Sequence, residues 1–232
     1  RLSRHVMLAD EAYCIGGAAS KESYLNIDRI IRVALACGAD AVHPGYGFLS
    51  ENADFARRCA EAGLVFIGPR PETIDAMGDK ISARRKMIEA GVPVVPGTQE
   101  NLSGADEAVE ACRRIGFPVM LKASQGGGGK GMRLARSEDE VREAFVAARS
   151  EAVASFGDGT IYIERFVEEP HHIEFQILGD THGNVIHLCD RECSVQRRHQ
   201  KIVEESPSPF LTPELRERMG ADAVAAARAV GY

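Results

Sequence analysis

The stretch with the clearest chemical meaning is a run of glycines between two short apolar segments. Residues 126–129 are four consecutive glycines, Lys122 lies near the end of the apolar segment before them, and Lys130 follows them. Glycine lets the backbone approach a ligand closely and aim several N–H groups at it. Backbone donors flanked by two ammonium groups suit a polyphosphate, so this stretch predicts a site for nucleotide phosphates.

Two familiar phosphate motifs do not fit the glycine run. The spacing Gly126-x-Gly128-x-x-Gly131 matches the dinucleotide fingerprint, but that fingerprint needs a helix to begin at the glycines, and residues 132–134 favour a strand. Ser124 stands where a P-loop has its first glycine. We therefore predict a strand, a glycine flap that covers phosphates, and a second strand. A flexible surface hairpin is the alternative.

Three further polar features accompany the flap. Lys80 lies in the first turn of a predicted helix that follows Met77-Gly78-Asp79. Residues 161–170 are a strand and its exit, where the backbone could bind an adenine while Glu164 accepts the exocyclic amine. Residues 196–201 are a polar extended segment. Each feature alone is equally well explained as solvated surface, but their spacing relative to the flap favours one shared site.

Composition excludes several classes of protein. Of 232 residues, 44% are apolar and 27% are charged, which is usual for a globular protein. The net charge is −6 and no long basic stretch occurs, which argues against a nucleic-acid partner. No apolar run reaches membrane-spanning length, and no signal-peptide pattern opens the chain.

The six cysteines are scattered through apolar segments, which predicts reduced thiols in a compartment like the cytosol. The spacing Cys189-x3-Cys193-x5-His199 could suggest a zinc site, but no CxxC motif and no fourth ligand support it. Buried free thiols are the preferred interpretation.

The first third of the chain alternates strand and helix patterns. We expect strands at 10–15, 40–42 and 65–67 and helices at 23–36 and 52–62. This alternation predicts a parallel sheet with helices on its faces. Ligands in such sheets bind beyond the carboxyl ends of the strands, which is where the loop 43–52 would lie.

The rest of the chain has a different pattern. Short helices are expected at 71–77 and 79–90, and Pro/Gly-rich residues 91–97 follow as a linker. A small α+β unit then surrounds the glycine flap, with helices at 105–115 and 137–155 and a strand at 160–164. Antiparallel strands at 172–177 and 185–190, joined by a turn at 181–184, lead to a last helix that Thr212-Pro213 caps and that runs to residue 230.

With these features together, the whole chain closely resembles the biotin carboxylase component of biotin-dependent carboxylases, members of the ATP-grasp superfamily. The resemblance rests on the stretches 43–52, 77–80, 122–132 and 191–201, of which the first and last are the most specific. It implies an α/β and α+β fold: an incomplete parallel-sheet pre-ATP-grasp domain at 1–68, a helical linker at 69–93, an ATP-grasp lid subdomain at 94–166, and the incomplete C-terminal ATP-grasp subdomain from 167 to 232.

The resemblance implies ATP- and Mg²⁺- (or Mn²⁺-) dependent carboxylation of biotin on a carrier protein. Bicarbonate attacks the γ-phosphate, and the resulting carboxyphosphate delivers CO₂ to the biotin ureido nitrogen. The implied partners are a biotin carboxyl carrier protein or domain, a carboxyltransferase component and, for the full-length protein, a second copy in a homodimer. Neither nucleic acid nor membrane is implied. The implied location is the cytoplasm, or the mitochondrial matrix in a eukaryote.

The resemblance also assigns roles to matching residues of this chain. It assigns Lys80 and Lys122 to the phosphates, and Gly128 and Gly129 to the lid. It assigns Glu164, Arg165, Phe166 and Val167 to adenine, and His172 to the ribose. It assigns Gln196 and His199 to the nucleotide pocket, and Lys201 to bicarbonate. His199 and Lys201 are the two that it places in the catalytic group.

The chain departs from the family pattern at its ends. The family's acidic metal ligands, general base and biotin-side arginine would follow Tyr232, and its first strand would precede Arg1. We therefore expect no metal ligands in this length, and we expect this length alone to be inactive.

Two other functions remain possible from the residues. One is an ATP-grasp ligase of the carbamoyl-phosphate synthetase type, against which the stretches 43–52 and 196–201 argue. The other is a non-catalytic nucleotide-binding module. The presence together of Lys80, Lys122, Glu164, His199 and Lys201 argues against it.

Overall fold

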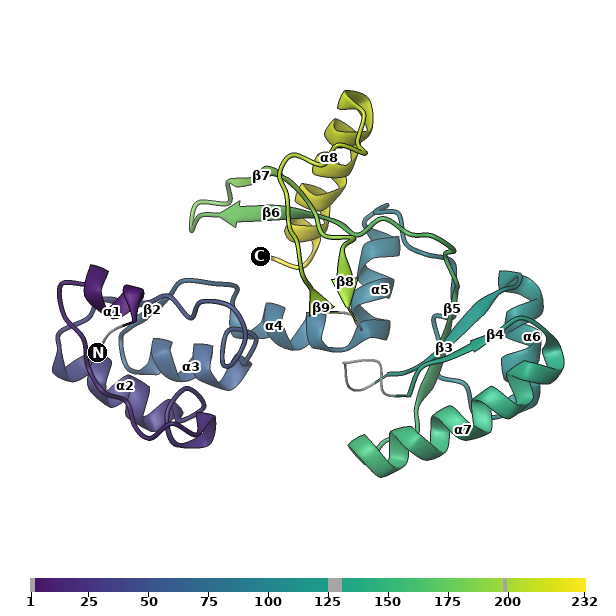
Figure 1. Cartoon of the computed structure of the whole chain (residues 1–232), viewed down its shortest axis with the longest axis horizontal. Coiled ribbons are helices and arrows are strands. Elements are labelled where there is room, and N and C mark those ends of the chain that lie inside the picture. Colours follow the sequence, from purple (N-terminus) through teal and green to yellow (C-terminus); the bar gives the residue numbers. More distant parts are fainter. Residues whose placement is uncertain (1–2, 125–130, 198–199) are drawn as a thin grey trace. The chain divides into compact units, whose positions relative to one another are not determined.

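The computed structural model describes residues 3–124, 131–197 and 200–232, without the side chain of Lys80. It divides into two compact units, Arg1–Asp75 and Ala76–Tyr232, which are described separately (Figure 1). Within the described residues, every helix is either too short or too polar to cross a lipid bilayer.

The first unit is a small parallel α/β arrangement. Its elements in order are α1 (Arg4–Leu8), the 3-10 turn η1 (Ser20–Glu22), α2 (Ile27–Ala36), β1 (Ala41–Val42), α3 (Ala53–Glu61) and β2 (Val65–Phe66). β1 and β2 pair in parallel, as the alternating pattern predicted. The core is formed by residues from both helices and the strand ends, among them Ile31, Phe55, Cys59 and Leu64.

Two asparagines set where the helices of this unit begin. The Asn26 side chain accepts a hydrogen bond from the Arg29 N–H at 3.0 Å, and Asn52 accepts one from the Phe55 N–H at 2.7 Å. Such caps satisfy helix donors that have no partner inside the helix. The predicted helix start at Ser23 was therefore wrong, because the chain makes a 3-10 turn before the Asn26 cap. The strand expected at 10–15 is also absent: residues 11–14 are exposed and pair with no other strand.

The second unit contains the remaining elements. They are α4 (Pro71–Gly78), which crosses the unit boundary, α5 (Lys80–Glu89), α6 (Ala105–Ile115), β3 (Val119–Ala123), β4 (Arg133–Ala135), α7 (Glu138–Phe156), β5 (Ile161–Arg165), β6 (Ile173–Gly179), β7 (Val185–Glu192), β8 (Gln196–Arg197), β9 (Gln200–Lys201) and α8 (Pro213–Ala229).

β4, β3 and β5 form an antiparallel sheet in that order, with α6 and α7 packed on one face (Figure 1). Val119, Leu121 and Ala123 of β3 are buried against the helices, together with Ile161 and Ile163 of β5. Since successive strand residues point to opposite faces, Met120 and Lys122 lie on the face away from α6 and α7. The core of this sheet therefore determines the direction of Lys122.

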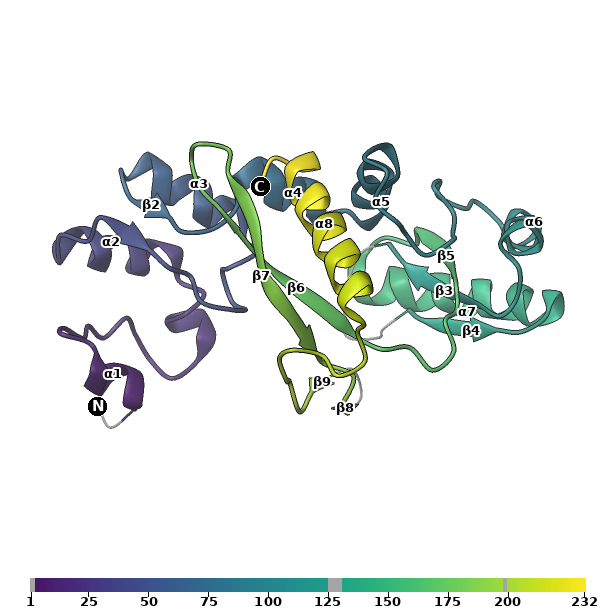
Figure 2. The same ribbon diagram turned by 90° about the horizontal axis from the view of Figure 1, so that it is seen from above.

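β6 and β7 form an antiparallel hairpin with a register shift between Phe175 and Ile177. Helix α8 lies along both strands (Figure 2). Their contact is close at Gly220, where an added Cβ would come within 2.6 Å of His187 Nε2. The short strands β8 and β9 follow the hairpin and pair with each other through Gln196 and Lys201, and through Arg197 and Gln200.

Candidate functional site

The first group of candidate side chains lies on the face of the β3–β5 sheet away from α6 and α7. Met120 is paired with Glu164 and Lys122 with Tyr162, so Lys122 and Glu164 are diagonal neighbours on the same face. Lys122 Nζ donates to Glu164 Oε2 at 2.5 Å. Arg84 Nη1, from α5, reaches Glu164 Oε1 at 3.4 Å. Both carboxylate oxygens of Glu164 therefore contact a cation.

This group is largely shielded from water. The side chains of Arg84, Glu164 and Lys122 are 9%, 20% and 28% exposed. Partial burial makes such ion pairs stronger than those on an open surface. Lys122 precedes the first glycine of the run by four residues, and residues 125–130 lie outside the described part of the chain, so its predicted contact with a phosphate stays a prediction.

The chain leaves β5 through Arg165, Phe166 and Val167, which were predicted to contact adenine. The Arg165 N–H donates to Pro96 O at 2.7 Å, and the Phe166 N–H donates to Pro118 O at 2.9 Å. The Arg165 side chain donates to Ile115 O at 3.2 Å, whereas the Val167 side chain is half-exposed. Two of the three N–H groups are thus used to hold the exit segment in place.

The second group lies on the β6–β7 hairpin and β9, around Glu174. Arg191 donates to Glu174 Oε1 from Nε at 2.7 Å, and its Nη2 is 2.6 Å from the same oxygen. The other oxygen, Oε2, accepts from Lys201 Nζ and lies 3.6 Å from His172 Nε2. Two predicted site residues, His172 and Lys201, therefore meet at one carboxylate.

The charges in this second group reinforce one another. Burial raises the pKa of Glu174, but hydrogen bonds from Lys201 and Arg191 outweigh it, so the pKa lies below its ordinary value. The hydrogen bond to Glu174 raises the pKa of Lys201. Lys201 is therefore kept as an ammonium ion. Glu204 Oε2 lies 4.0 Å from Arg191 Nε, so the two cations of this group face two carboxylates.

Glu174, Cys193 and Glu204 bring one ligand atom each within 4.8 Å of one another. They do not fit Mg²⁺, because that ion takes oxygen ligands and avoids thiols. Glu174 is also already neutralised by Lys201 and Arg191. No step of the chemistry is assigned to a metal at these residues.

The other predicted site residues divide into two sets. Gln196 is half-buried on β8 and donates to Cys193 O at 2.8 Å. The Lys80 side chain, Gly128, Gly129 and His199 lie outside the described residues, so their predicted roles stay predictions.

Reasoning from the sequence missed Arg84 as a partner of Glu164, and Glu174 and Arg191 as partners of Lys201. Glu174 carried a weak signal, because the alternation of β6 places it on a polar face. Arg84 carried none, because its partner is 80 residues away in sequence.

Comparison with known proteins identifies the family models that the chain matches. Residues 1–74 match the biotin carboxylase N-terminal domain, and residues 79–232 match the carbamoyl-phosphate synthase L chain ATP-binding domain. The biotin carboxylase of Halalkalibacterium halodurans is 56% identical over 230 residues, which are 99% of this chain and 51% of that protein. Pyruvate carboxylase 1 of Caenorhabditis elegans is 55% identical over 231 residues, which are 99% of this chain and 20% of that protein.

A solved structure agrees with these matches. It is the biotin carboxylase domain dimer of Hydrogenobacter thermophilus 2-oxoglutarate carboxylase in complex with MgADP, ADP and bicarbonate. The TM-score is 0.86 at 52% identity, over 100% of this chain and 51% of that one. The chain thus spans about half the length of the biotin carboxylase and of the biotin carboxylase domain that it matches, and a smaller share of the pyruvate carboxylase.

Proposed function

This chain belongs to the biotin carboxylase family, and we propose that the protein carboxylates biotin on a carrier protein, using ATP and bicarbonate. The resemblance stated from the sequence is thereby confirmed, and so is the ATP-grasp fold. The observation that carries the proposal is the pairing of Lys122 with Glu164, largely shielded from water, on the face of the sheet away from α6 and α7.

The nucleotide end of the proposed site supplies position and charge. Phosphoryl transfer depends mainly on these two effects, with little covalent chemistry from the protein. Lys122 would leave Glu164 for a phosphate oxygen, while Arg84 would hold Glu164 in place beside the adenine. Lys80, Gly128 and Gly129 would complete the phosphate contacts, and closure of the flap would exclude water from the carboxyphosphate.

The bicarbonate end of the proposed site is the cluster around Lys201. Its ammonium group is held by Glu174, whose second oxygen is held by Arg191. Bicarbonate would bind at Lys201 because its ammonium group stays charged and its side chain is partly exposed, so it can contact a second anion beside Glu174. Transfer of the ATP γ-phosphoryl group to this bicarbonate gives the carboxyphosphate that donates CO₂ to biotin.

The proposed partners follow from the same reaction. A biotin-bearing carrier protein must bring the acceptor nitrogen to the site, and a carboxyltransferase must consume the carboxybiotin. Named relatives include a biotin carboxylase and a pyruvate carboxylase, so the proposal ends at carboxybiotin and assigns no acyl acceptor. Mg²⁺ and a homodimer are proposed for the whole protein because the Hydrogenobacter structure is a dimer with MgADP.

The decisive experiment uses the intact protein and compares Lys201→Met with wild type. Loss of the ammonium group should lower bicarbonate-dependent ATP cleavage by about 100-fold, as removal of one charge-stabilising donor does elsewhere. Affinity for ADP should change little, because Lys201 is assigned to bicarbonate.

Arg142→Gln is the matched control, since Arg142 is an exposed cation of α7 that pairs with Asp106 outside the site. Its ATP cleavage should equal that of wild type. A wild-type protein whose ATP cleavage ignores both bicarbonate and biotin would refute the proposed reaction.

A further inference from the structure

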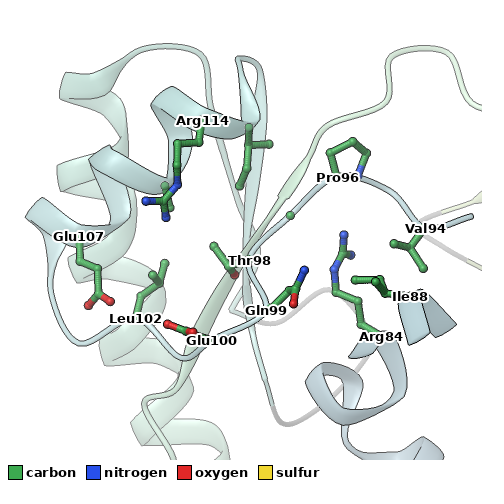
Figure 3. A pocket seen from close by; sticks show the side chains of 13 residues that line it. Arg84, Ile88, Val94, Pro96, Thr98, Gln99, Glu100, Leu102, Glu107 and Arg114 are labelled. Atoms are coloured by element: carbon green, nitrogen blue, oxygen red, sulfur yellow. The ribbon is translucent and has the colours of Figure 1, made fainter. Parts of the chain in front are cut away.

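A cavity that the proposed reaction does not use lies behind Glu164, between α5, residues 94–102 and α6 (Figure 3). Its volume is about 690 Å³, within the ~300–1,000 Å³ of typical small-molecule sites. Arg84 and Ile88 of α5 line one side, and Arg114 of α6 stands across Thr98 from them. All of these residues belong to the second unit.

Arg84 is the unusual residue of this cavity. Its side chain is only 9% exposed. Nη1 makes a long 3.4 Å contact with Glu164, and Nη2 donates to Val95 O. Nε is buried and has no hydrogen-bond partner. A buried donor on a cation that lacks a partner is costly, and it is best satisfied by an anionic oxygen.

The remaining lining defines the rest of a ligand. Ile88 and Val94 lie next to Arg84, whereas Leu102 lies on the opposite side of the cavity beside Glu107 (Figure 3). At the other end, Glu107 Oε2 already accepts from Ser103 N at 2.9 Å and from Ser103 Oγ at 2.6 Å. Among the described lining residues, Arg84 is the charged side chain that is strongly buried and keeps a polar atom without a partner, whereas Glu100, Glu107 and Arg114 are exposed.

We propose that this cavity binds a small carboxylic acid with an apolar body. A carboxylate oxygen accepts from Arg84 Nε, after a small rotation of the side chain that opens Nε to the cavity. The apolar body lies against Ile88 and Val94. Arg84 also contacts Glu164, so this site adjoins the proposed nucleotide position, but binding of the acid does not depend on the proposed reaction.

The test is calorimetric titration of the intact protein, without nucleotide, using 3-phenylpropanoate as the probe and the uncharged 3-phenylpropanamide as its isostere. The acid should bind saturably in the millimolar range expected of so small a ligand. The amide should bind at least about tenfold more weakly, because it brings no charge to Arg84. Equal affinity for the acid and the amide would overturn the proposal, and so would the lack of saturable binding of the acid.

Three variants locate the site. Arg84→Gln should bind the acid about tenfold more weakly, whereas Lys86→Gln, two residues along α5 and outside the lining, should bind it as wild type does. Ile88→Glu is a second route, because Ile88 is 38% exposed and tolerates a polar replacement. This substitution should weaken binding of the acid about tenfold through charge repulsion and leave the affinity for the amide unchanged.

Thermal unfolding shows which variants are folded. If the Arg84→Gln protein is not folded, the affinity of the Ile88→Glu protein for the acid tests the proposal instead. Binding of the acid to a folded Arg84→Gln or Ile88→Glu protein with wild-type affinity would overturn the proposal.

Discussion

At the scale of single residues, Glu164 shows how one carboxylate could organise the proposed nucleotide site before any nucleotide is bound. Its two oxygens contact Lys122 and Arg84, which come from β3 and α5. A phosphate takes Lys122 from such a carboxylate at low cost, because Arg84 still balances the charge of Glu164. The free protein thus holds Lys122 in one orientation and still allows it to exchange Glu164 for another anion.

This arrangement makes a direct prediction for Lys122→Met. Loss of the ammonium group should weaken ADP binding by about 10- to 100-fold, the value of one to two charge-assisted contacts with phosphate. The fold should be nearly unaffected, because Glu164 keeps its contact with Arg84. Equilibrium titration with ADP measures the effect, and Lys86→Met serves as a control lysine. Unchanged ADP affinity in Lys122→Met would remove Lys122 from the phosphate site.

A site residue could be predicted from the sequence when the pattern that marks it lies in the residues next to it. Lys122, Glu164 and Lys201 stand next to glycines, at a strand end or in a polar segment, all visible along the chain. Their partners Arg84, Glu174 and Arg191 are fixed by strand register and by helix placement over 17 to 80 residues of sequence. Short-range patterns do not contain that information.

At the scale of elements, helices with clear ends were predicted best. The helix at 105–115 was predicted with the bounds observed for α6, because Gly104 and Gly116 bracket it. The last helix was predicted to begin after Thr212, whose side chain does accept from the Leu215 N–H at 3.2 Å. The strand at 10–15 failed because strand formation needs a pairing partner, and apolar composition alone does not supply one.

The packing of α8 on β7 depends on a buried ion pair. The Asp190 side chain is completely buried, and it accepts from Arg216 Nε at 2.7 Å and from the Ser208 N–H at 2.6 Å. Burial raises the pKa of Asp190, but these hydrogen bonds outweigh it and the net pKa is lowered. The carboxylate therefore links α8 and the segment after β9 to the hairpin.

Arg216→Gln should lower the free energy of unfolding by about 3 kcal/mol at neutral pH, because it leaves a buried carboxylate without its cation. A lowered carboxyl pKa stabilises the fold above the ordinary value near 4, and this contribution is lost as pH falls through the folded-state pKa. The difference between wild type and variant should therefore narrow as pH is lowered from 7 to below 4.

Urea unfolding at several pH values measures this difference, and Arg218→Gln, an exposed arginine of the same helix, should change stability by less than about 0.5 kcal/mol. A constant difference across the pH range would show that Arg216 acts through packing and not through the charge of Asp190.

At the scale of the whole molecule, the chain is two units with separate cores. The buried cluster of the first contains Ile31, Phe55 and Leu64, whereas that of the β3–β5 sheet is larger and includes both helices α6 and α7. All six cysteines are free thiols, so no disulfide links the units. Units with their own cores open and close as separate cooperative parts.

A ligand that binds one unit should therefore protect that unit from local opening and leave the other unchanged. The proposed nucleotide contacts described here, Lys122, Glu164 and His172, all belong to the second unit. ADP at about 100 times its Kd should stabilise the binding-competent form by about 2.7 kcal/mol.

Amide hydrogen exchange of the intact protein should then slow in β3, β5 and β6, by up to about 100-fold where exchange requires opening of the whole unit. The amides of α3, whose core residues include Phe55 and Cys59, serve as the internal control and should exchange at the same rate with and without ADP. Protection of α3 equal to that of β3 would show that the two units unfold together, and protection of neither would show that the nucleotide is not held by the Lys122–Glu164 face.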